Sequence, residues 1–333
     1  MTTFIEIKNS LGTEVILCNV GASIYDIKTK DKNGKLESIL YMNKEKSEFI
    51  NDDSYFGKTI GRTGGRLTNS RFVLNGKEYK IPSNDPNGLH GGNDSLSFKE
   101  FEFKKNEEEL YTEIDFYYLS KNMESGYPGN LDLHVIYKLY KNENKLIVNY
   151  IGKSDEDTLL NLSNHSYFNL SGDAKEDILN HKLYINSSKM EKIVNLLPVK
   201  IEECKKIYSF KNSHKIGDYL KDEEIINNTN GYDFPYIFDD VDENKFNIIL
   251  ESEKRRLKIK TTYPTVVVYT CNYVGNKIMN NNKLMMPYYA ICLECMYHPN
   301  TINSDFLKEK KDILRKNRKY DERIEYYFEV KND

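Results

Sequence analysis

Apolar and polar residues alternate through much of this chain, and turn-forming dipeptides separate the alternating segments. Residues 131–139, LDLHVIYKL, are the clearest case, because every second residue is apolar. Successive side chains of a β-strand point to opposite faces of a sheet, so this spacing predicts a strand with one buried face. Residues 145–151 supply a partner strand across the polar turn at 141–144. The residues that share the apolar face are Leu131, Leu133, Val135, Tyr137 and Leu139.

Two Asn-Gly dipeptides predict tight turns between antiparallel strands. Asn and Gly tolerate the positive φ angles that a two-residue type I′ turn requires. Asn75-Gly76 joins residues 71–74 to residues 77–81, and Asn33-Gly34 is a second turn of this kind.

β-Branched and aromatic residues recur along the chain, with a turn about every 8–12 residues, as in sandwiches and barrels. Residues 215–226 and 305–316 are each predicted to hold a short helix, although their apolar stripes are thin. The pattern as a whole predicts an all-β fold with few short helices. Further strands are expected at residues 4–8, 110–119, 245–250, 255–262, 265–270, 289–295 and 324–330.

Chain length leaves the number of domains open, whereas charge and hydropathy exclude some classes of partner. One large all-β unit or two ordinary domains would both account for 333 residues. The 48 basic and 51 acidic residues are interspersed, and the net charge of −3 gives no basic face for nucleic acid. No apolar run approaches the roughly 20 residues of a membrane span, and MTTFIEIKNS has no signal-peptide pattern. We therefore expect a cytoplasmic protein with a small or neutral partner, and neither nucleic acid nor membrane as a partner.

The five cysteines form an odd and scattered set, which predicts free thiols in a reducing compartment. Cys292 and Cys295 form a CxxC, but in an apolar run that is typical of a strand. Three residues apart on a strand, these side chains point to opposite faces and cannot both bind one metal ion. The pair is therefore predicted to pack in the core. The chain also shows neither βαβ alternation nor a glycine-rich phosphate loop, which argues against a nucleotide-dependent enzyme.

Two histidines lie in unusual polar contexts. His90 belongs to LHGG, after a loop rich in Asn, Asp and Pro, where the backbone can turn sharply. His165 belongs to NHSYFNL, in which hydrogen-bonding side chains alternate with aromatic ones, as is typical of a sugar site. For each histidine, a purely structural position with its hydrogen bonds satisfied is the alternative.

Two carboxylates are candidates for chemistry, because an exposed Asp or Glu with a pKa near 4 is a poor base at neutral pH. Glu294 is the one acidic residue in the apolar run 290–296, which predicts that it is buried. Asp233 lies in GYDFP, where an aspartate that forms a turn is the alternative.

Arg66 follows a glycine-rich stretch, GRTGGR, in which the backbone can approach another group closely. Its guanidinium can donate several hydrogen bonds to hydroxyl groups, or it can brace a neighbouring carboxylate. The residues alone do not decide between these two functions.

Taken together, these segments resemble the aldose 1-epimerase, or galactose mutarotase, family. The resemblance covers nearly the whole chain, and the segments follow one another in the family's order. NHSYFNL and the ordered set around it are specific, whereas LHGG or GYD alone is weak. The segments are FGKTIGRTGGRLTNSRFVLNGKEYKI, LHGG, GYPGNLDLHVIYKL, NLSNHSYFNLSG, NGYDFPYIF, VVVYTCNYVG and CLECMYHPNTIN.

The resemblance implies an enzyme that interconverts the α and β anomers of free hexoses such as glucose and galactose. It implies that His165 is the catalytic acid and Glu294 the catalytic base, while Arg66, His90 and Asp233 bind the sugar. It further implies one large antiparallel β-sandwich domain over residues 1–333, without a metal or other cofactor. The expected partner is a small aldose sugar, bound by a monomer or homodimer.

The chain departs from the family pattern at several positions. Gly65 stands where the family usually has Asn before the binding arginine, which removes one side chain from the site. The family's Pro-Thr-Gly loop is Pro198-Val199-Lys200 here, and its later Asp-Phe pair is Ser209-Phe210. The tryptophan usual after LHGG is absent, and Phe101 is a candidate replacement. The preferred sugar therefore stays open.

Two rival functions remain at this point. A glycoside hydrolase also works at C1, but it normally uses two carboxylates instead of a His/Glu pair. A sugar-binding protein without activity is the second rival, and the altered position 65 is consistent with it. Such a protein needs no acid and base, so the retention of His165 and Glu294 favours an enzyme.

Overall fold

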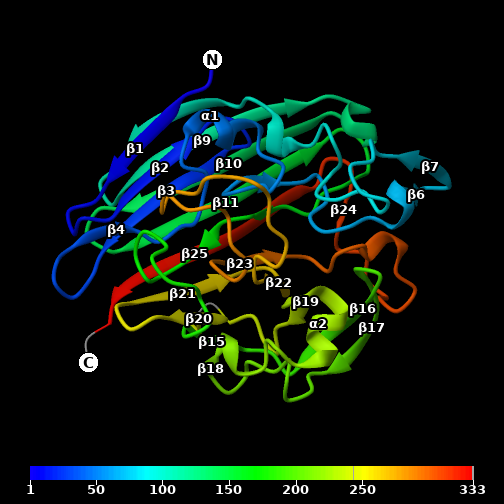
Figure 1. Ribbon diagram of the computed structural model, residues 1–333. Helices are drawn as coiled ribbons and strands as arrows, with labels where there is room; N and C mark the ends of the chain where they lie inside the picture. The colour runs from blue at the N-terminus through cyan, green and yellow to red at the C-terminus, as the bar shows by residue number, and fades with distance from the viewer. Residues whose placement is uncertain (243, 332–333) are drawn as a thin grey trace.

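The computed structural model describes residues 1–242 and 244–331, and the predicted antiparallel all-β fold is confirmed (Figure 1). Neighbouring strands of the three large sheets pair antiparallel. Strand β10 shows why these residues form strands, since its buried and less buried positions alternate as the sequence predicts.

The nine-stranded sheet has the order β18 (His214–Lys215), β15 (Lys182–Ile185), β20 (Ile248–Glu251), β21 (Arg255–Thr261), β25 (Lys319–Val330), β11 (Lys145–Ser154), β10 (Leu131–Tyr140), β9 (Tyr111–Ser120) and β8 (Glu102–Glu107). The six-stranded sheet has the order β14 (Tyr167–Phe168), β23 (Ile291–Met296), β22 (Thr265–Tyr269), β19 (Asp233–Ile237), β16 (Lys189–Val194) and β17 (Leu197–Glu203). The four-stranded sheet comprises β1 (Phe4–Lys8), β2 (Glu14–Cys18), β3 (Ser23–Lys30) and β4 (Leu36–Ser38). Three short pairs are β6 (Arg71–Leu74) with β7 (Lys77–Lys80), β12 (Thr158–Leu159) with β24 (Ile313–Leu314), and β13 (Ser163–Asn164) with β5 (Thr59–Ile60). The α-helices among the described residues are α1 (Lys46–Asn51) and α2 (Glu223–Thr229).

The four- and six-stranded sheets pack against the nine-stranded sheet. A bridge between Leu40 and Phe168 joins the two smaller sheets edge to edge. The Tyr137 hydroxyl of β10 donates a hydrogen bond to the Ala22 carbonyl at 2.6 Å, beside β3. Phe168 packs on Tyr326 of β25, with ring centroids 5.6 Å apart. Buried apolar residues from all three sheets belong to one core cluster, so the arrangement is a sandwich.

The two Asn-Gly turns join the expected strands by different means. Asn75 and Gly76 both have positive φ, 51° and 78°, as a type I′ turn between β6 and β7 requires. The other turn, between β3 and β4, is closed by Asp31. Its carboxylate accepts the backbone N–H groups of Asn33 and Lys35, each at 2.9 Å.

The helix predictions were largely wrong. Residues 215–226 hold only a short 3₁₀ turn, Ile216–Asp218, and the start of α2, which begins with Asp222 as its N-cap. Residues 305–316 form no helix, because the chain there pairs in extended form with β12 through β24. The backbone carbonyl of Asp312 accepts the N–H of Leu160 at 2.7 Å in the same contact. A thin apolar stripe does not outweigh such strand pairing.

The predicted core positions of the cysteines are confirmed for Cys292 and Cys295, which are both buried on β23. All five cysteines are free thiols, as expected. None of the helices in the described part of the chain is long and apolar enough to cross a membrane.

Strand register aligns the side chains of neighbouring strands in two rows across the six-stranded sheet. Directly paired residues point to the same face, so both rows lie on the face of the sheet opposite to Val266, Val268 and Phe234. The intervening residues Val266, Val268 and Phe234 are buried in the core. The first row is Tyr167, Cys292, Tyr269 and Asp233, and the second is Glu294, Val267 and Pro235.

The sandwich core predicts a contrast between two leucines on neighbouring strands. Leu133 is 0% exposed on β10, and Leu119 is 45% exposed on β9. We expect Leu133→Ala to lower the free energy of unfolding by about 2–5 kcal/mol through lost burial and a cavity. Leu119→Ala is the control and should change it by about 0.5 kcal/mol or less. Urea unfolding measures both, and equal losses would contradict this assignment of the core.

Candidate active site

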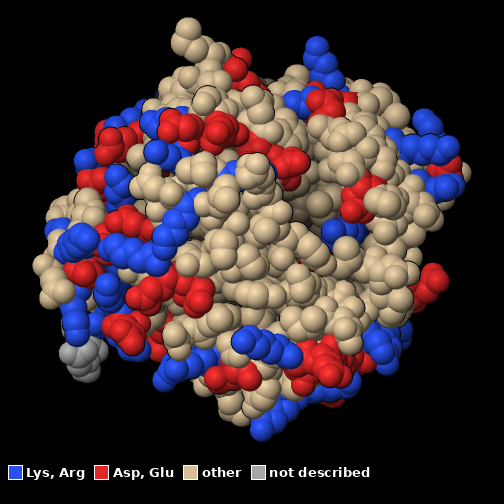
Figure 2. Space-filling model, viewed as in Figure 1, with Lys and Arg blue, Asp and Glu red and all other residues tan. Residues whose placement is uncertain are grey.

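A cavity of about 250 Å³ opens on the outer face of the six-stranded sheet. Figure 2 shows the hollow, with both acidic and basic atoms at its mouth. All five residues singled out in the sequence line this one cavity, although their sequence positions span more than half of the chain. Its lining comprises Asp53, Ser54, Tyr55, Gly65, Arg66, Leu89, His90, His165, Tyr167, Asp233, Val267, Tyr269, Tyr273 and Glu294.

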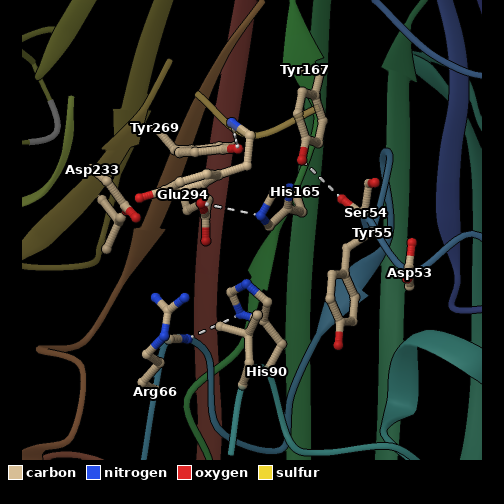
Figure 3. A pocket seen from close by; sticks show the side chains of 14 residues that line it. Asp53, Ser54, Tyr55, Arg66, His90, His165, Tyr167, Asp233, Tyr269 and Glu294 are labelled. Atoms are coloured by element: carbon tan, nitrogen blue, oxygen red, sulfur yellow. Dashed lines mark hydrogen bonds and ion pairs between the residues drawn. The ribbon is translucent and has the colours of Figure 1, made fainter. Parts of the chain in front are cut away.

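His165 and Glu294 form the centre of the cavity wall (Figure 3). The Nε2 atom of His165 lies 3.3 Å from Oε1 of Glu294, and both side chains are almost fully buried. The other ring nitrogen of His165, Nδ1, lies 3.6 Å from the sulfur of Cys292. The second carboxylate oxygen of Glu294, Oε2, is buried and has no hydrogen-bond partner among the described residues. An unpaired buried carboxylate oxygen is costly unless a ligand hydroxyl binds it.

Burial shifts the pKa values of this pair in opposite directions. Desolvation lowers the pKa of His165 to about 4, so the isolated imidazole is neutral near pH 7. Desolvation also raises the pKa of Glu294 well above its usual range, and the nearby charge of Asp233 raises it further. Arg66 opposes this shift only in part. Together the two groups hold one proton over the intervening pH range.

His90 presents a hydrogen-bond donor to the cavity. Its Nδ1 accepts the backbone N–H of Gly65 at 3.1 Å, and its own backbone N–H donates to the Gly65 carbonyl at 2.9 Å. Burial lowers the pKa of His90 well below its usual value, helped by His165 and Arg66. A neutral imidazole that accepts at Nδ1 carries its hydrogen on Nε2. Nε2 is therefore available to donate to a ligand oxygen.

Arg66 and Asp233 lie at the other end of the cavity from Tyr55 (Figure 3). A bridge with Leu89 positions Arg66, and its Nε lies 3.6 Å from an Asp85 carboxylate oxygen. That distance is too long for a hydrogen bond, and the buried Nε has no such partner among the described residues. Burial raises the pKa of Asp233 to about 6, although Arg66 opposes the shift. The guanidinium and the carboxylate together offer donors and an acceptor to ligand hydroxyls.

Four tyrosines complete the wall, and sequence reasoning did not single them out. The Tyr167 hydroxyl donates to the Ser54 carbonyl at 2.9 Å, and Tyr55 packs edge-on against His90 with centroids 4.9 Å apart. Tyr269 accepts the Tyr273 backbone N–H at 3.1 Å, and Tyr273 is 52% exposed at the mouth. A strand was expected at residues 265–270, but only the strand register shows which side chains meet in the cavity.

His90, His165 and Glu294 are also the described residues that come closest to a metal-binding set. One potential ligand atom from each lies within 4.8 Å of the others. However, metal-bound histidine normally donates its remaining ring N–H, whereas His90 accepts a hydrogen bond at Nδ1. Its Nε2 then carries a hydrogen and is no ligand, which leaves two candidate ligands and favours acid–base chemistry.

The family model described as aldose 1-epimerase matches residues 3–327, almost the full length of the chain. The chain belongs to the aldose 1-epimerase family. Mouse galactose mutarotase is 30% identical over 291 residues, which cover 85% of this chain and 82% of that protein. The aldose 1-epimerase of Escherichia coli K12 is 24% identical over 335 residues, covering 97% and 94%.

Solved structures of family members share the fold over the whole chain. An aldose epimerase homologue from C. elegans superposes with a TM-score of 0.90 at 25% identity and covers 100% of both chains. The galactose 1-epimerase of Lactobacillus acidophilus gives 0.86 at 25% identity, covering 100% and 99%. The protein is accordingly an isomerase of the aldose 1-epimerase class, with the sandwich fold of that family.

The raised pKa of Glu294 predicts a pH-dependent stability difference. Above pH 4.5 the unfolded carboxyl group is ionised, whereas the folded one keeps its proton, so the parent loses stability as pH rises. Glu294→Gln has no such loss. We therefore expect the free energy of unfolding of the variant, minus that of the parent, to rise with pH. The rise begins near pH 5 and continues up to the pKa of Glu294 in the folded protein, by at most about 1.4 kcal/mol per pH unit.

Urea unfolding at pH 5, 6, 7 and 8 measures this difference. The control is Glu203→Gln on β17, whose side chain is 73% exposed. A difference between Glu294→Gln and the parent that does not change with pH would contradict the burial account.

Proposed function

We propose that this enzyme interconverts the α and β anomers of free hexoses such as glucose and galactose, with Glu294 as base and His165 as acid. The observation that carries the proposal is the buried, unpartnered Oε2 of Glu294 beside His165 in a cavity of sugar size. Such an oxygen can accept the proton of the C1 hydroxyl, while the neighbouring imidazole reaches the ring oxygen.

The reaction begins with ring opening. Glu294 takes the proton from the C1 hydroxyl, the bond between C1 and the ring oxygen breaks, and His165 gives its proton to that ring oxygen. The product is an open-chain aldehyde. Rotation about C1–C2 then presents the other face of the carbonyl group, and the same steps in reverse close the ring as the other anomer.

Burial assists the proton transfers. In the reactive closed-ring state, Glu294 is a carboxylate and His165 is an imidazolium. In the alternative arrangement the same proton lies on Glu294, and both groups are uncharged. Opening the ring leaves Glu294 protonated and His165 neutral, and desolvation favours this uncharged arrangement. The low dielectric of the site thus stabilises the open-chain complex relative to the charged starting state.

His90, Arg66 and Asp233 hold the sugar in this proposal. His90 donates through Nε2, Arg66 donates through its guanidinium, and Asp233 accepts or donates according to pH. Tyr55 and Tyr273 supply aromatic surface for the C–H groups of a sugar ring. These contacts orient the sugar so that its C1 hydroxyl lies against Glu294.

We expect the enzyme to accelerate the relaxation of freshly dissolved α-glucose and α-galactose, followed by polarimetry. Glu294→Gln preserves shape but is no base, so kcat should fall at least about 10²-fold while sugar binding persists. His165→Ala should also lose most of its turnover and remain folded. Parent relaxation no faster than buffer would leave a binding protein, and a fully active Glu294→Gln would remove the proposed base.

Arg66→Ala and Asp233→Ala should mainly raise KM. Groups that hold hydroxyls remote from C1 bind ground state and transition state alike, so their loss weakens both to a similar extent. Initial rates over a range of glucose concentrations separate KM from kcat. A loss confined to kcat would mean that these two residues take part in the chemistry.

A further inference from the structure

An apolar recess of about 40 Å³ adjoins the sugar cavity at Arg66 and Asp233, which line both spaces. Gly65 and Val267 also line both spaces, so the two are neighbours that share these four residues. The volume has room for one group of roughly the size of a water molecule or a methyl group, about 30 Å³. Its apolar walls are Ile193, Leu196, Pro198, Pro235, Val267 and Pro299.

The far wall of the recess is held by a contact between His298 and the buried carboxylate of Glu191. Nδ1 of His298 contacts the carboxylate of Glu191, which is 0% exposed on β16. This contact ties the segment after β23 to β16, across the sheet, and so fixes Pro299. A Cβ atom at Gly65 would lie 2.8 Å from the Cβ of Pro299, so the missing side chain permits this close approach.

The order of the side chains indicates which part of a sugar faces the recess. Figure 3 shows Asp233, Glu294 and His165 in sequence along the cavity wall, and Asp233, at one end of this row, also lines the recess. The proposed function places the ring oxygen at His165 and the C1 hydroxyl at Glu294. C1 is bonded to the ring oxygen on one side and to C2 on the other, so C2 lies on the side of C1 that is away from His165. The C2 substituent therefore points toward Asp233 and Arg66.

We propose that the site accepts aldoses with an acetamido group at C2, and that the recess binds the acetamido methyl group. The amide N–H donates to the Asp233 carboxylate, the amide carbonyl accepts from the Arg66 guanidinium, and the methyl group enters the recess. A hydroxyl group at C2 can satisfy one of the polar partners but leaves the apolar walls unfilled. This inference rests on the proposed anomer exchange and extends it to a second class of sugar.

N-acetylglucosamine and glucose are the probes, and polarimetry follows the relaxation of the α anomer of each with the parent enzyme. We expect faster relaxation than in buffer for both sugars. Saturation-transfer NMR of the bound N-acetylglucosamine should show its acetamido methyl group among the most strongly saturated protons.

Ile193→Phe tests the recess, because Ile193 lines the recess but not the sugar cavity. We expect kcat/KM for N-acetylglucosamine to fall at least about 10-fold more than kcat/KM for glucose. Val199→Phe places the same side chain at a 45% exposed position of β17 and should leave the ratio of the two constants unchanged. Ile193→Ala, which enlarges the recess, is the second variant if Ile193→Phe does not fold, and it should also lower this ratio.

The outcomes separate the two proposals. Activity on glucose with buffer-like relaxation of N-acetylglucosamine would overturn the recess assignment and leave the proposed function intact. Equal losses for both sugars in the Ile193 variants would also overturn it. Buffer-like relaxation of N-acetylglucosamine, glucose and galactose in the parent would overturn both proposals.

Discussion

The proposed chemistry depends on the burial of one carboxylate and one imidazole that share a proton. In water, Glu294 and His165 would be an ordinary base and an ordinary acid with separate charges. Removed from water and 3.3 Å apart, they can hold one proton in either a charged or an uncharged arrangement. The chemistry proposed for the site alternates between these two arrangements, so neither a net gain nor a net loss of protons is needed over the cycle.

The sandwich supplies the rigidity that such a pair requires. Glu294 lies on a strand flanked on both sides by paired strands, and the core beneath it is continuous with the nine-stranded sheet. On the loop side, the buried Arg62 guanidinium donates to the Pro128 carbonyl at 2.9 Å and to the Ser120 carbonyl at 3.1 Å. Arg62 thereby anchors the segment that leads to Gly65 and Arg66, so both walls of the cavity are fixed.

The sequence predicted the elements whose signal is local. Period-two alternation placed β10 and β11, and Asn75-Gly76 placed the β6–β7 hairpin, because strand faces and turn angles depend on neighbouring residues. The helix at 305–316 was wrong because pairing with β12, more than 140 residues earlier, decides that segment. Helix α1 went unpredicted, since its six residues carry a single buried side chain, Phe49.

In the active site, the polar residues could be recognised from the sequence, but the side chains that surround them could not. Glu294 stood out because a charge in an apolar run needs a reason. Local context also marked Arg66, His90, His165 and Asp233 as candidates, and the family resemblance implied their roles. That Tyr269 and Asp233 are opposite each other follows from strand register between segments 36 residues apart in sequence. The recess beside Arg66 requires five separate segments to meet, which no local pattern encodes.

The protonation of the buried pair can be measured directly. NMR titration of protein labelled with ¹³C at the glutamate carboxyl groups and ¹⁵N in the histidine rings reports both groups in the folded enzyme. Single-residue variants assign the Glu294 and His165 signals. We predict that His165 stays neutral down to about pH 4 and that the Glu294 carboxyl remains protonated well above pH 4.5. A Glu294 signal that titrates near 4.5 together with a His165 signal that titrates near 6.5 would contradict the shared-proton account.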